Sequence, residues 1–592
     1  MKKMIAILLS AVSVVFSACQ MPMQGGHTCS YTLQKAEERF LKSEATCQEK
    51  AKYYYSCECG KAGEKTFTYG VLGKHDNSAE VVSNEYLKTV ANCQDPAVYY
   101  KSCTVCGQKA YGSETFTYGE PGDCAYVNEI VADEFLKQDA TQAERAIYYK
   151  SCVCGATGEA TFYYGQKLKE FTAEEKIPYT PTSLTVSLYE PENSVYGFTW
   201  NTESMPLRPM IQIQEGNELT GECKQYSARV EAASSYDADK NVINYYIVKA
   251  EIKLDPNKTY TYRAYDKYVE IGTEQATITT KDTKATTFTF SHVSDTQGSD
   301  TSYSGWPFGK TLGEITKSSD FIVHSGDVVE NSQYEYEWKA MLDSNYKHLS
   351  SIPVMAISGN HETTYKSGSN ETYKHFNNKI PAQVSTEKGY YYSFTYGNAK
   401  FIMLNTNNLV GNKLETAQYD WLVNELQNNT ATWTIVVLHN PLYSVGQWGA
   451  GTNNSTALAL RKQLQGIFAQ YGVDLVLQGH DHTVSRSYPI NAQGEPQAET
   501  FVQQNGVNYS KNPAGVVYMT NGVGGVSARV PTAIDPALYA YAYEEKSKSC
   551  TWGEFEISEN VMKVTVKYVK ITTKDEDTGI VESYYTWGIM KD

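Results

Sequence analysis

Short runs of alternating apolar and polar residues occupy the middle of the chain. SLTVSLYE, NYYIVKAEIKL and TYTYRAYD alternate with a period of two, and turn residues separate them. A period of two predicts strands with one buried face, and several short strands in succession are typical of a β-sandwich. We therefore predict an all-β sandwich over residues 177–284.

The pattern changes from residue 286 onward. Continuous apolar runs such as FIVH, TIVVL and VDLVL now alternate with segments of helical periodicity such as AQYDWLVNELQNN and STALALRKQLQGIFAQYG. Buried strands that alternate with helices predict an α/β sheet covered by helices. Residues 286–592 are accordingly predicted to form a separate α/β domain.

Residues 27–170 contain three copies of one unit. The copies read KYYYSCECGKAGEKTFTYG, VYYKSCTVCGQKAYGSETFTYG and IYYKSCVCGATGEATFYYG, and an acidic stretch of helical pattern precedes each. The region holds ten cysteines: Cys29, Cys47, Cys57, Cys59, Cys93, Cys103, Cys106, Cys124, Cys152 and Cys154. These units resemble Cys-Gly repeats of surface proteins of anaerobic bacteria, which implies a stalk or an attachment module that contacts the cell surface.

Two chemical roles are open for the repeat cysteines. Zinc is one, because Cys-Gly knuckles supply thiolates to a tetrahedral ion, and Cys103 and Cys106 have the two-residue separation that such knuckles favour. In the first and third repeats only one residue separates the paired cysteines, which argues against zinc. Disulfide bonds are the other role, since they stabilise small exported modules.

Residues 1–19, MKKMIAILLSAVSVVFSAC, have the layout of a secretory signal. A short basic start is followed by an apolar run and then by small residues before Cys19. A cysteine in this place resembles the lipobox of bacterial lipoproteins, which implies a lipid on Cys19; plain cleavage near Ala18 is the alternative. Both predict an extracellular or cell-surface protein, and a lipid on Cys19 would be its only membrane contact.

The net charge argues against a nucleic-acid partner. The chain carries −15 at pH 7 and has an isoelectric point near 5.3, so no basic surface is available to bind a phosphate backbone. A small phosphate ester is still compatible with this charge.

Five predicted strands of residues 286–592 end in side chains that bind metal ions. In chain order these are Asp295 with Gln297, Asp327, Asn360 with His361, His439, and His480 with His482. Ligand sites in open α/β sheets lie at the carboxyl ends of the strands. Oxygen and imidazole donors at five successive strand ends are what a phosphoesterase with two metal ions needs.

The motifs DTQ, GDVVE, GNHE, VLH and GHDH resemble those of the calcineurin-like metallophosphoesterase superfamily, in its purple-acid-phosphatase-like branch. WNT and LDPNKTYTYRA resemble the fibronectin-type domain that precedes the catalytic domain in that branch. The resemblance implies a four-layer α/β metallophosphoesterase sandwich over residues 286–592, behind a fibronectin-type sandwich over residues 177–284.

The resemblance also implies roles for individual side chains. One metal ion would be bound by Asp295, Gln297 and His482, the other by Asn360, His439 and His480, with Asp327 as the bridge. His361 would be the catalytic proton donor to the leaving group, with Glu362 as its orienting partner. A structural role for His361 is the alternative.

Two positions depart from the family pattern. Glu330 stands three residues after Asp327, where purple acid phosphatases have the tyrosine that binds ferric iron, so a ferric ion is not implied. Gln297 stands where the wider superfamily has histidine, and an amide oxygen is a harder and weaker donor than imidazole. Manganese, iron and zinc are all open as the two divalent ions.

The predicted function is hydrolysis of small phosphate esters by attack of metal-bound hydroxide, with monoesters favoured. The alternatives are a phosphodiesterase of the same fold, or a surface-binding protein whose phosphoesterase domain is inactive. His292 and His324 are predicted to be core histidines and His375 to lie at the surface, while ordinary packing is the expectation for Trp338 and Tyr443.

Overall fold

The computed structural model describes residues 28–592 with internal gaps, and the predicted signal and Cys19 lie outside the described residues. The gaps are residues 92, 94, 111–113, 142, 298–303, 364–370, 383, 385–389, 450–453, 526–528, 533, 544–548 and 571–580. The chain divides into two compact units, Met1–Gly122 and Asp123–Asp592. In the described part of the chain, no helix is both long enough and apolar enough to cross a membrane.

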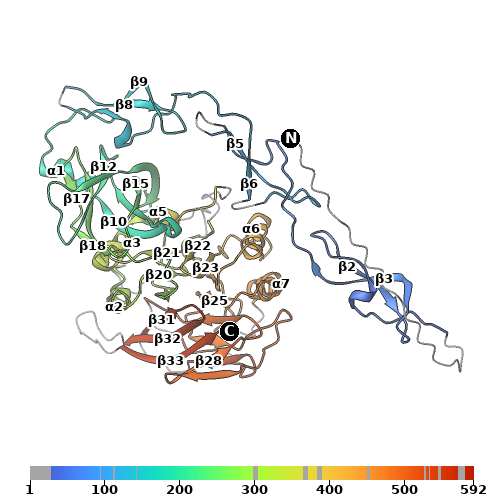
Figure 1. Ribbon diagram of the computed structural model, residues 1–592. Coiled ribbons are helices and arrows are strands. Elements are labelled where there is room, and N and C mark those ends of the chain that lie inside the picture. Colours follow the sequence, from blue (N-terminus) through green and yellow to red (C-terminus); the bar gives the residue numbers. More distant parts are fainter. Residues whose placement is uncertain are drawn as a thin grey trace. The chain divides into compact units, whose positions relative to one another are not determined.

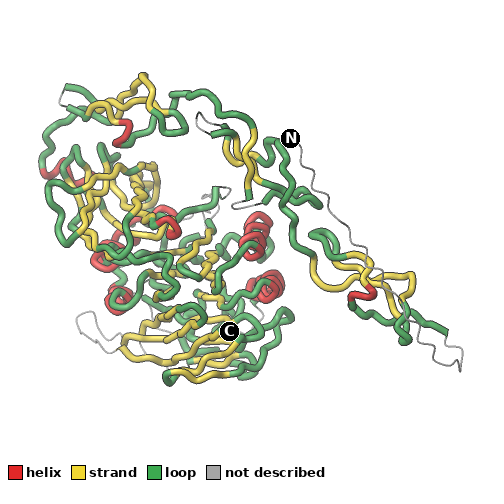
Figure 2. The backbone as a smooth tube through the Cα atoms, viewed as in Figure 1, coloured by secondary structure: helices red, strands yellow, loops and turns green. Residues whose placement is uncertain are grey.

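Each repeat forms a three-stranded antiparallel sheet, and Figure 2 shows that strands and loops dominate these segments. The strands are β1 (Leu41–Ser43), β2 (Lys50–Ser56) and β3 (Ala62–Leu72); β4 (Leu87–Thr89), β5 (Ala97–Tyr100) and β6 (Thr115–Tyr118); β7 (Leu136–Gln138), β8 (Ala146–Ser151) and β9 (Thr157–Tyr164). The helical pattern before the repeats was misleading. Among the described residues, single 3-10 turns form before the first and third repeats, Glu38–Phe40 and Asp133–Phe135, because these two stretches each bury one phenylalanine rather than a continuous apolar stripe.

One aromatic pair recurs in every repeat sheet. Tyr53 lies opposite Phe67 in the register of β2 and β3, and their rings stack 5.9 Å apart. The equivalent pairs are Tyr99 with Phe116 at 5.6 Å and Tyr148 with Phe162 at 5.7 Å. Cross-strand aromatic pairs stabilise small sheets that have little other core, and they account for part of the high tyrosine content.

The third repeat packs against the β-sandwich within the second unit. Phe135 and Tyr148 share a buried cluster with Leu207 and Tyr268. The hydroxyl of Tyr268 donates to Asp139 at 2.9 Å and accepts from the backbone N–H of Ala140 at 2.9 Å. This repeat is therefore fixed to the sandwich by both apolar and polar contacts.

The β-sandwich consists of two antiparallel sheets around a core that includes Phe198, Trp200 and Tyr262. One sheet has the order β10 (Thr182–Glu190), β11 (Val195–Thr202), β15 (Val242–Lys253), β14 (Arg229–Tyr236). The other contains β13 (Lys224–Ser227), β12 (Pro209–Glu215), β16 (Thr259–Asp266) and β17 (Ile271–Gly272), with β18 (Ala276–Thr279) paired to β16. The all-β prediction is confirmed here, whereas the fibronectin-type identity stays a prediction.

The α/β domain contains two large sheets. The first has the order β21 (Val354–Ala356), β20 (Phe321–His324), β19 (Phe288–Val293), β31 (Ser549–Ile557), β32 (Val561–Lys570), β33 (Val581–Met590), β28 (Val507–Lys511), β27 (Phe501–Gln504). The second has the order β22 (Tyr392–Tyr396), β23 (Ala399–Met403), β24 (Trp433–Leu438), β25 (Leu475–Gln478), β29 (Val517–Thr520), β26 (Ser485–Ser487), β30 (Tyr539–Ala542). β19, β20 and β21 run parallel to one another, as do β23, β24, β25 and β29. The predicted mixed α/β architecture is confirmed.

Alternate residues of these strands face different layers. Phe401 on β23 joins the core between the two sheets, whereas its neighbour Ile402 joins the cluster under α6 (Thr416–Gln427) and α7 (Ser455–Gln470). On the first sheet, Ile322 packs under α2 (Trp306–Ile315) and α3 (Glu335–Ser344). The domain thus has four layers, with helices outside two facing sheets (Figure 1).

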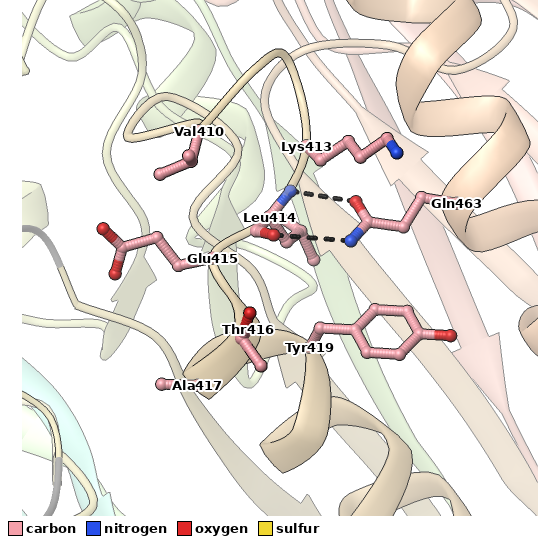
Figure 3. A pocket seen from close by; sticks show the side chains of 8 residues that line it. All are labelled: Val410, Lys413, Leu414, Glu415, Thr416, Ala417, Tyr419 and Gln463. Atoms are coloured by element: carbon pink, nitrogen blue, oxygen red, sulfur yellow. Dashed lines mark hydrogen bonds between the residues drawn. The ribbon is translucent and has the colours of Figure 1, made fainter.

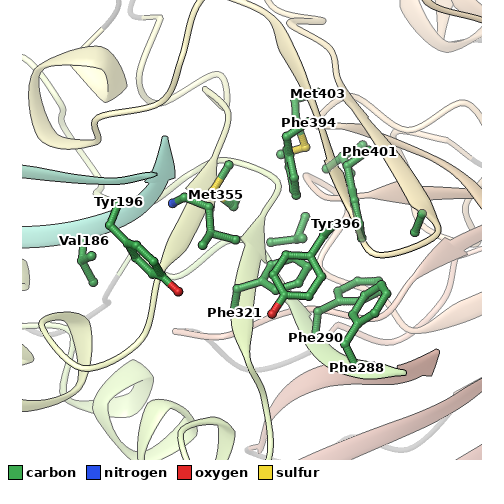
Figure 4. Packing of buried hydrophobic residues seen from close by; sticks show 14 of the residues in the cluster. Val186, Tyr196, Phe288, Phe290, Phe321, Met355, Phe394, Tyr396, Phe401 and Met403 are labelled. Atoms are coloured by element: carbon green, nitrogen blue, oxygen red, sulfur yellow. Dashed lines mark hydrogen bonds between the residues drawn. The ribbon is translucent and has the colours of Figure 1, made fainter. Parts of the chain in front are cut away.

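Phe290 lies at the centre of the core between the sheets, where several phenylalanine rings gather (Figure 4). Its ring stacks on Phe555 at 4.6 Å and on Phe321 at 5.5 Å, and it meets Phe401 edge-on at 5.1 Å. Residue Phe290 therefore joins strands of both sheets through rings that leave no room for water.

We expect Phe290→Ala to lower the free energy of unfolding of the second unit by about 3–5 kcal/mol, because a buried ring is replaced by a cavity. Denaturant unfolding of the full chain measures the change. Phe501→Ala, at a half-exposed edge-strand position, is the control and should change it by less than about 0.5 kcal/mol. Equal stability of the two variants would contradict the central role of Phe290.

Candidate metal centre

The carboxyl ends of five strands from both sheets meet at one edge of the α/β domain. β19, β20 and β21 are adjacent and parallel in the first sheet, and β24 and β25 are adjacent and parallel in the second. The loops that follow carry all of the predicted ligands, namely Asp295, Gln297, Asp327, Asn360, His439, His480 and His482. The site is therefore built between two sheets rather than along the edge of one.

One group of donors surrounds Asp327. Its Oδ2 lies 3.2 Å from Nε2 of His439, and the same nitrogen lies 2.9 Å from Oδ1 of Asn360. The ligand atoms of Asp327, His439 and His480 all lie within 4.8 Å of one another. Nδ1 of His439 is held 2.8 Å from the carbonyl oxygen of Ser325, which leaves Nε2 directed at the cluster.

A second group surrounds Asp295. Its Oδ1 lies 3.2 Å from Nε2 of His482, and the backbone N–H of His480 donates to both carboxylate oxygens at 3.0 and 3.1 Å. Gln297 reaches the first group, since its Nε2 lies 3.4 Å from Oδ2 of Asp327. Its Oε1 is buried and has no hydrogen-bond partner among the described residues.

The donor set fits divalent cations. Asp295 and Asp327 are both buried, and two buried carboxylates repel each other unless a cation lies between them. Burial alone would lower the pKa of His439, but the charges of Asp327 and Asp295 raise it to about 9. An unpartnered amide oxygen and a negative local field are the features that a hard divalent ion would satisfy.

The ligand loops adopt unusual backbone conformations. Asp295, Asp327, His480 and His482 have φ values of 53°, 58°, 70° and 49°, in the left-handed region that disfavours residues with a Cβ atom. Such conformations cost about 1–3 kcal/mol each and persist only where the surroundings enforce them, most often at functional sites. Four such residues within one cluster indicate that the backbone accepts a conformational cost in order to direct these side chains towards one another.

Two glycines, Gly359 and Gly479, allow these loops to approach one another closely. A Cβ atom at Gly359 would overlap Oδ1 and the backbone nitrogen of Asp327. At Gly479 a Cβ atom would lie 3.1 Å from both Oδ2 of Asp295 and Nδ1 of His439. The glycines of the GNHE and GHDH motifs therefore allow the backbone to pass directly beside the ligands.

Glu362 holds the loops together through backbone hydrogen bonds, and its predicted role as the orienting partner of His361 stays a prediction. Oε2 of Glu362 accepts from the backbone N–H groups of Asp327 at 2.8 Å and Gly359 at 2.7 Å, while Oε1 accepts from Val328 at 2.8 Å and Val329 at 3.4 Å. Burial and the charge of Asp327 raise the pKa of Glu362 to about 7, and the N–H donors oppose that rise. The carboxylate thereby fixes the position of the proposed bridging residue.

His361 lies at the open side of the cluster. Its side chain is 28% exposed, Nε2 lies 3.8 Å from Oδ2 of Asp327, and Nδ1 lies 2.6 Å from the carbonyl oxygen of Glu330. That carbonyl requires a proton on Nδ1, so Nε2 is the nitrogen that faces the cluster. The backbone N–H of His361 also donates to Oδ1 of Asp327 at 2.9 Å.

Asp481 and Trp448 were missed by the sequence reasoning. Asp481 stands between the two histidines of GHDH but accepts from the hydroxyl of Ser444 and from the backbone N–H groups of Trp448 and Gly449, the latter two at 3.2 Å. This ties the 444–449 loop to the ligand loop. Trp448 is 38% exposed, and its ring lies 5.1 Å from that of His480, so it forms a wall beside the site.

Three further histidines of the α/β domain, His292, His324 and His375, lie in the core. His292 contacts Asn521 and lies 2.9 Å from Oγ of Ser325, and His324 lies 2.9 Å from Oγ1 of Thr296; both are buried, as expected. The surface prediction for His375 was wrong. It is fully buried, stacks on Trp338 at 4.0 Å and lies 3.2 Å from Glu335, because α5 (Glu371–His375) folds back onto α3. Trp338 and Tyr443 are buried in the core.

A separate pocket of about 520 Å³ lies at the start of α6 (Figure 3). The backbone of Leu414 and the side-chain amide of Gln463 exchange hydrogen bonds of 2.9 and 3.3 Å across it. None of the predicted ligands lines this pocket, so it is distinct from the metal centre.

Residues 288–484 match the family of calcineurin-like phosphoesterases. Purple acid phosphatase 23 from Arabidopsis thaliana is 25% identical over 329 residues, which cover 49% of this chain and 65% of the relative. Acid phosphatase type 7 from Homo sapiens is 28% identical over 240 residues, 37% of this chain and 51% of the relative. The chain thus spans less than two thirds of the length of these relatives.

The fold is also similar to that of a solved structure, the purple acid phosphatase PPD1 from yellow lupin (Lupinus luteus) seeds. The TM-score is 0.56 at 17% sequence identity, over 70% of this chain and 75% of the lupin chain. The chain therefore contains a calcineurin-like metallophosphoesterase domain and has purple acid phosphatases among its homologues.

We expect Glu362→Gln to lower the free energy of unfolding by about 1–3 kcal/mol, because the amide nitrogen cannot accept from the buried N–H groups. Metal affinity should fall by about 10–100-fold through the loosened Asp327 loop. Calorimetry and metal titration measure the two effects. Glu415→Gln, at an exposed position before α6, is the control, and identical behaviour of both variants would contradict the assignment.

Proposed function

We propose that the protein is an exported metal-dependent phosphoesterase that hydrolyses small phosphate esters, with monoesters preferred. The observation that carries the proposal is the convergence of carboxylate, amide and imidazole donors from five strand ends, with an unpartnered buried oxygen on Gln297. The phosphatase homologues support the same reaction class. Export rests on the signal-like sequence of residues 1–19.

The proposed ligand set follows the two donor groups, except that Gln297, which lies beside the shared residue Asp327, is assigned to the ion of Asp295. Asp295, Gln297 and His482 would hold one ion, Asn360, His439 and His480 the other, and Asp327 would bridge them. When bound, two divalent ions supply positive charge for the phosphoryl oxygens and make water a stronger nucleophile at neutral pH. The buried position of the carboxylates excludes water from their other faces, which strengthens their hold on a cation.

His361 is proposed as the proton donor to the leaving group. Its Nδ1 is held by the carbonyl oxygen of Glu330, so Nε2 is the nitrogen free to carry a proton towards a substrate. The charge of Asp327 and the Glu330 carbonyl raise the pKa of His361 against the lowering effect of burial. A raised pKa favours the protonated imidazole, the form that a general acid needs.

The first test compares Asp327→Asn with the wild-type protein on p-nitrophenyl phosphate and bis-p-nitrophenyl phosphate, with manganese, iron(II) or zinc added. We expect hydrolysis to fall by more than about 100-fold, since changes outside the ligand shell alone cost about 10–100-fold. Asp420→Asn, on the exposed face of α6, is the control and should remain active. A preference for the diester would assign a phosphodiesterase, and no turnover by folded wild-type protein would overturn the proposal.

A second test separates acid catalysis from a structural role for His361. We expect His361→Gln to lower kcat for an alkyl phosphate by about 10²–10⁴-fold, because an alkoxide leaves only with a proton. With p-nitrophenyl phosphate the loss should be much smaller, since nitrophenolate leaves unprotonated. His348→Gln, on α4 (Tyr346–Leu349), serves as the control. An equal loss on both esters would indicate that His361 only positions Asp327.

A further inference from the structure

Four metal-binding side chains meet in the first unit, outside the phosphoesterase domain. They are Cys47 from the first repeat and His75, Cys103 and Cys106, which lie in and just before the second. Sγ of Cys47 lies 3.6 Å from Sγ of Cys103, and Sγ of Cys106 lies 3.3 Å from Nδ1 of His75. All four ligand atoms lie within 4.8 Å of one another.

These separations fit a tetrahedral ion. With zinc–sulfur bonds of about 2.3 Å, two thiolates on a tetrahedron lie about 3.8 Å apart. A disulfide bond would require about 2.05 Å between the sulfurs. The pair Cys47 and Cys103 is therefore spaced as two ligands of one ion, and three thiolates with one imidazole are a set that zinc binds in structural sites.

The loop between Cys103 and Cys106 has the geometry of a metal-binding knuckle. The backbone N–H groups of Val105 and Cys106 donate to the sulfur of Cys103. Gly107 closes the turn with a φ of 71°, and its N–H donates to the carbonyl oxygen of Cys103 at 2.9 Å. N–H groups directed at a sulfur stabilise the thiolate form, which is the form that binds metal.

Backbone contacts place the other two ligands. Asp76 accepts from the N–H and the hydroxyl of Thr104 at 2.8 and 3.0 Å, which holds the neighbouring His75 beside the knuckle. The N–H of Gly73 donates to the carbonyl oxygen of Thr46 at 2.9 Å, so Cys47 lies alongside the segment that carries His75. The four side chains are thus positioned by hydrogen bonds that do not depend on an ion.

The repeat spacing shows that His75 stands at a position equivalent to a cysteine of the other two repeats. His75 precedes Cys103 by 28 residues, and Cys29 precedes Cys57 by the same interval. Cys124 likewise lies 28 residues before Cys152 in the third repeat. Histidine thus occupies a position that is cysteine in both other repeats, and an exchange between cysteine and histidine preserves zinc binding.

We propose that Cys47, His75, Cys103 and Cys106 bind one Zn²⁺ ion that joins the first repeat to the second. The repeats have little apolar core, since Phe40, Phe67 and Ala110 are the buried non-cysteine hydrophobic residues among those described in the first unit. Small modules of this kind need a metal or disulfides for stability. Thiolates favour zinc over the harder ions that suit the phosphoesterase centre.

The proposal is confined to this one site. In the first repeat Cys29 and Cys59 lie 3.5 Å apart beside Cys57, but these residues supply only three ligands. In the third repeat the structure places Cys154 in a disulfide. Only at the Cys103–Cys106 loop of the second repeat do four possible ligands from the described part of the first unit converge.

The test uses the purified full chain, prepared under reducing conditions and loaded with Zn²⁺ or Co²⁺. We expect Cys47→Ser and His75→Ala each to weaken zinc binding by more than about 100-fold, and each to lose one zinc equivalent after dialysis against a mild chelator. Thiolate-to-cobalt absorption distinguishes this site from the phosphoesterase centre, whose proposed ligands include no cysteine. His75→Cys should retain both the metal and the absorption.

Cys223→Ser, in the loop before β13, is the matched control and should bind as much zinc as the wild-type protein. Phosphatase activity should be unchanged in Cys47→Ser, so failure of the proposed function and failure of this site can be told apart. Equal zinc content in Cys47→Ser and the wild-type protein would overturn the proposal. So would a disulfide between Cys47 and Cys103, found by mass spectrometry of protein alkylated without reduction.

Discussion

Repulsion between buried carboxylates is the constraint around which the phosphoesterase domain is organised. Asp295 and Asp327 are withdrawn from water at the meeting edge of two sheets, and His439 lies beside both negative charges. Without a cation the arrangement would be costly, because low-dielectric surroundings strengthen like-charge repulsion. The hydrophobic layers on either side supply the stability that allows such a site to persist.

The same constraint explains the local backbone. Four of the predicted ligand residues hold left-handed conformations, and position 359 requires glycine because a side chain there would overlap Asp327. Glu362 fixes this arrangement by accepting backbone N–H groups from two loops, and Asp481 does the same for the loop that carries Trp448. Glu362 and Asp481, two carboxylates within the predicted ligand motifs, thus accept hydrogen bonds from the backbone, whereas Asp295 and Asp327 are the carboxylates proposed to face a metal ion.

The repeats differ from the phosphoesterase domain because they lack, among their described residues, a large apolar core. Each is a three-stranded sheet with one cross-strand aromatic pair, too small to bury a large core. The third gains stability by packing on the sandwich through Tyr268 and its neighbours. In the first unit the thiol and imidazole cluster around Cys103 is the corresponding feature, and it joins segments of consecutive repeats.

The sequence by itself determined the class of each part, because strand alternation, buried apolar runs and the order of ligand motifs are local properties of the chain. From the sequence, Asp295, Asp327 and the GHDH histidines are predicted to be metal ligands, and the fold brings them together. The sequence could not show that Glu362 binds backbone, that His375 is buried, or that His75 lies beside Cys103. Those contacts join segments far apart in sequence, so only the tertiary structure decided them.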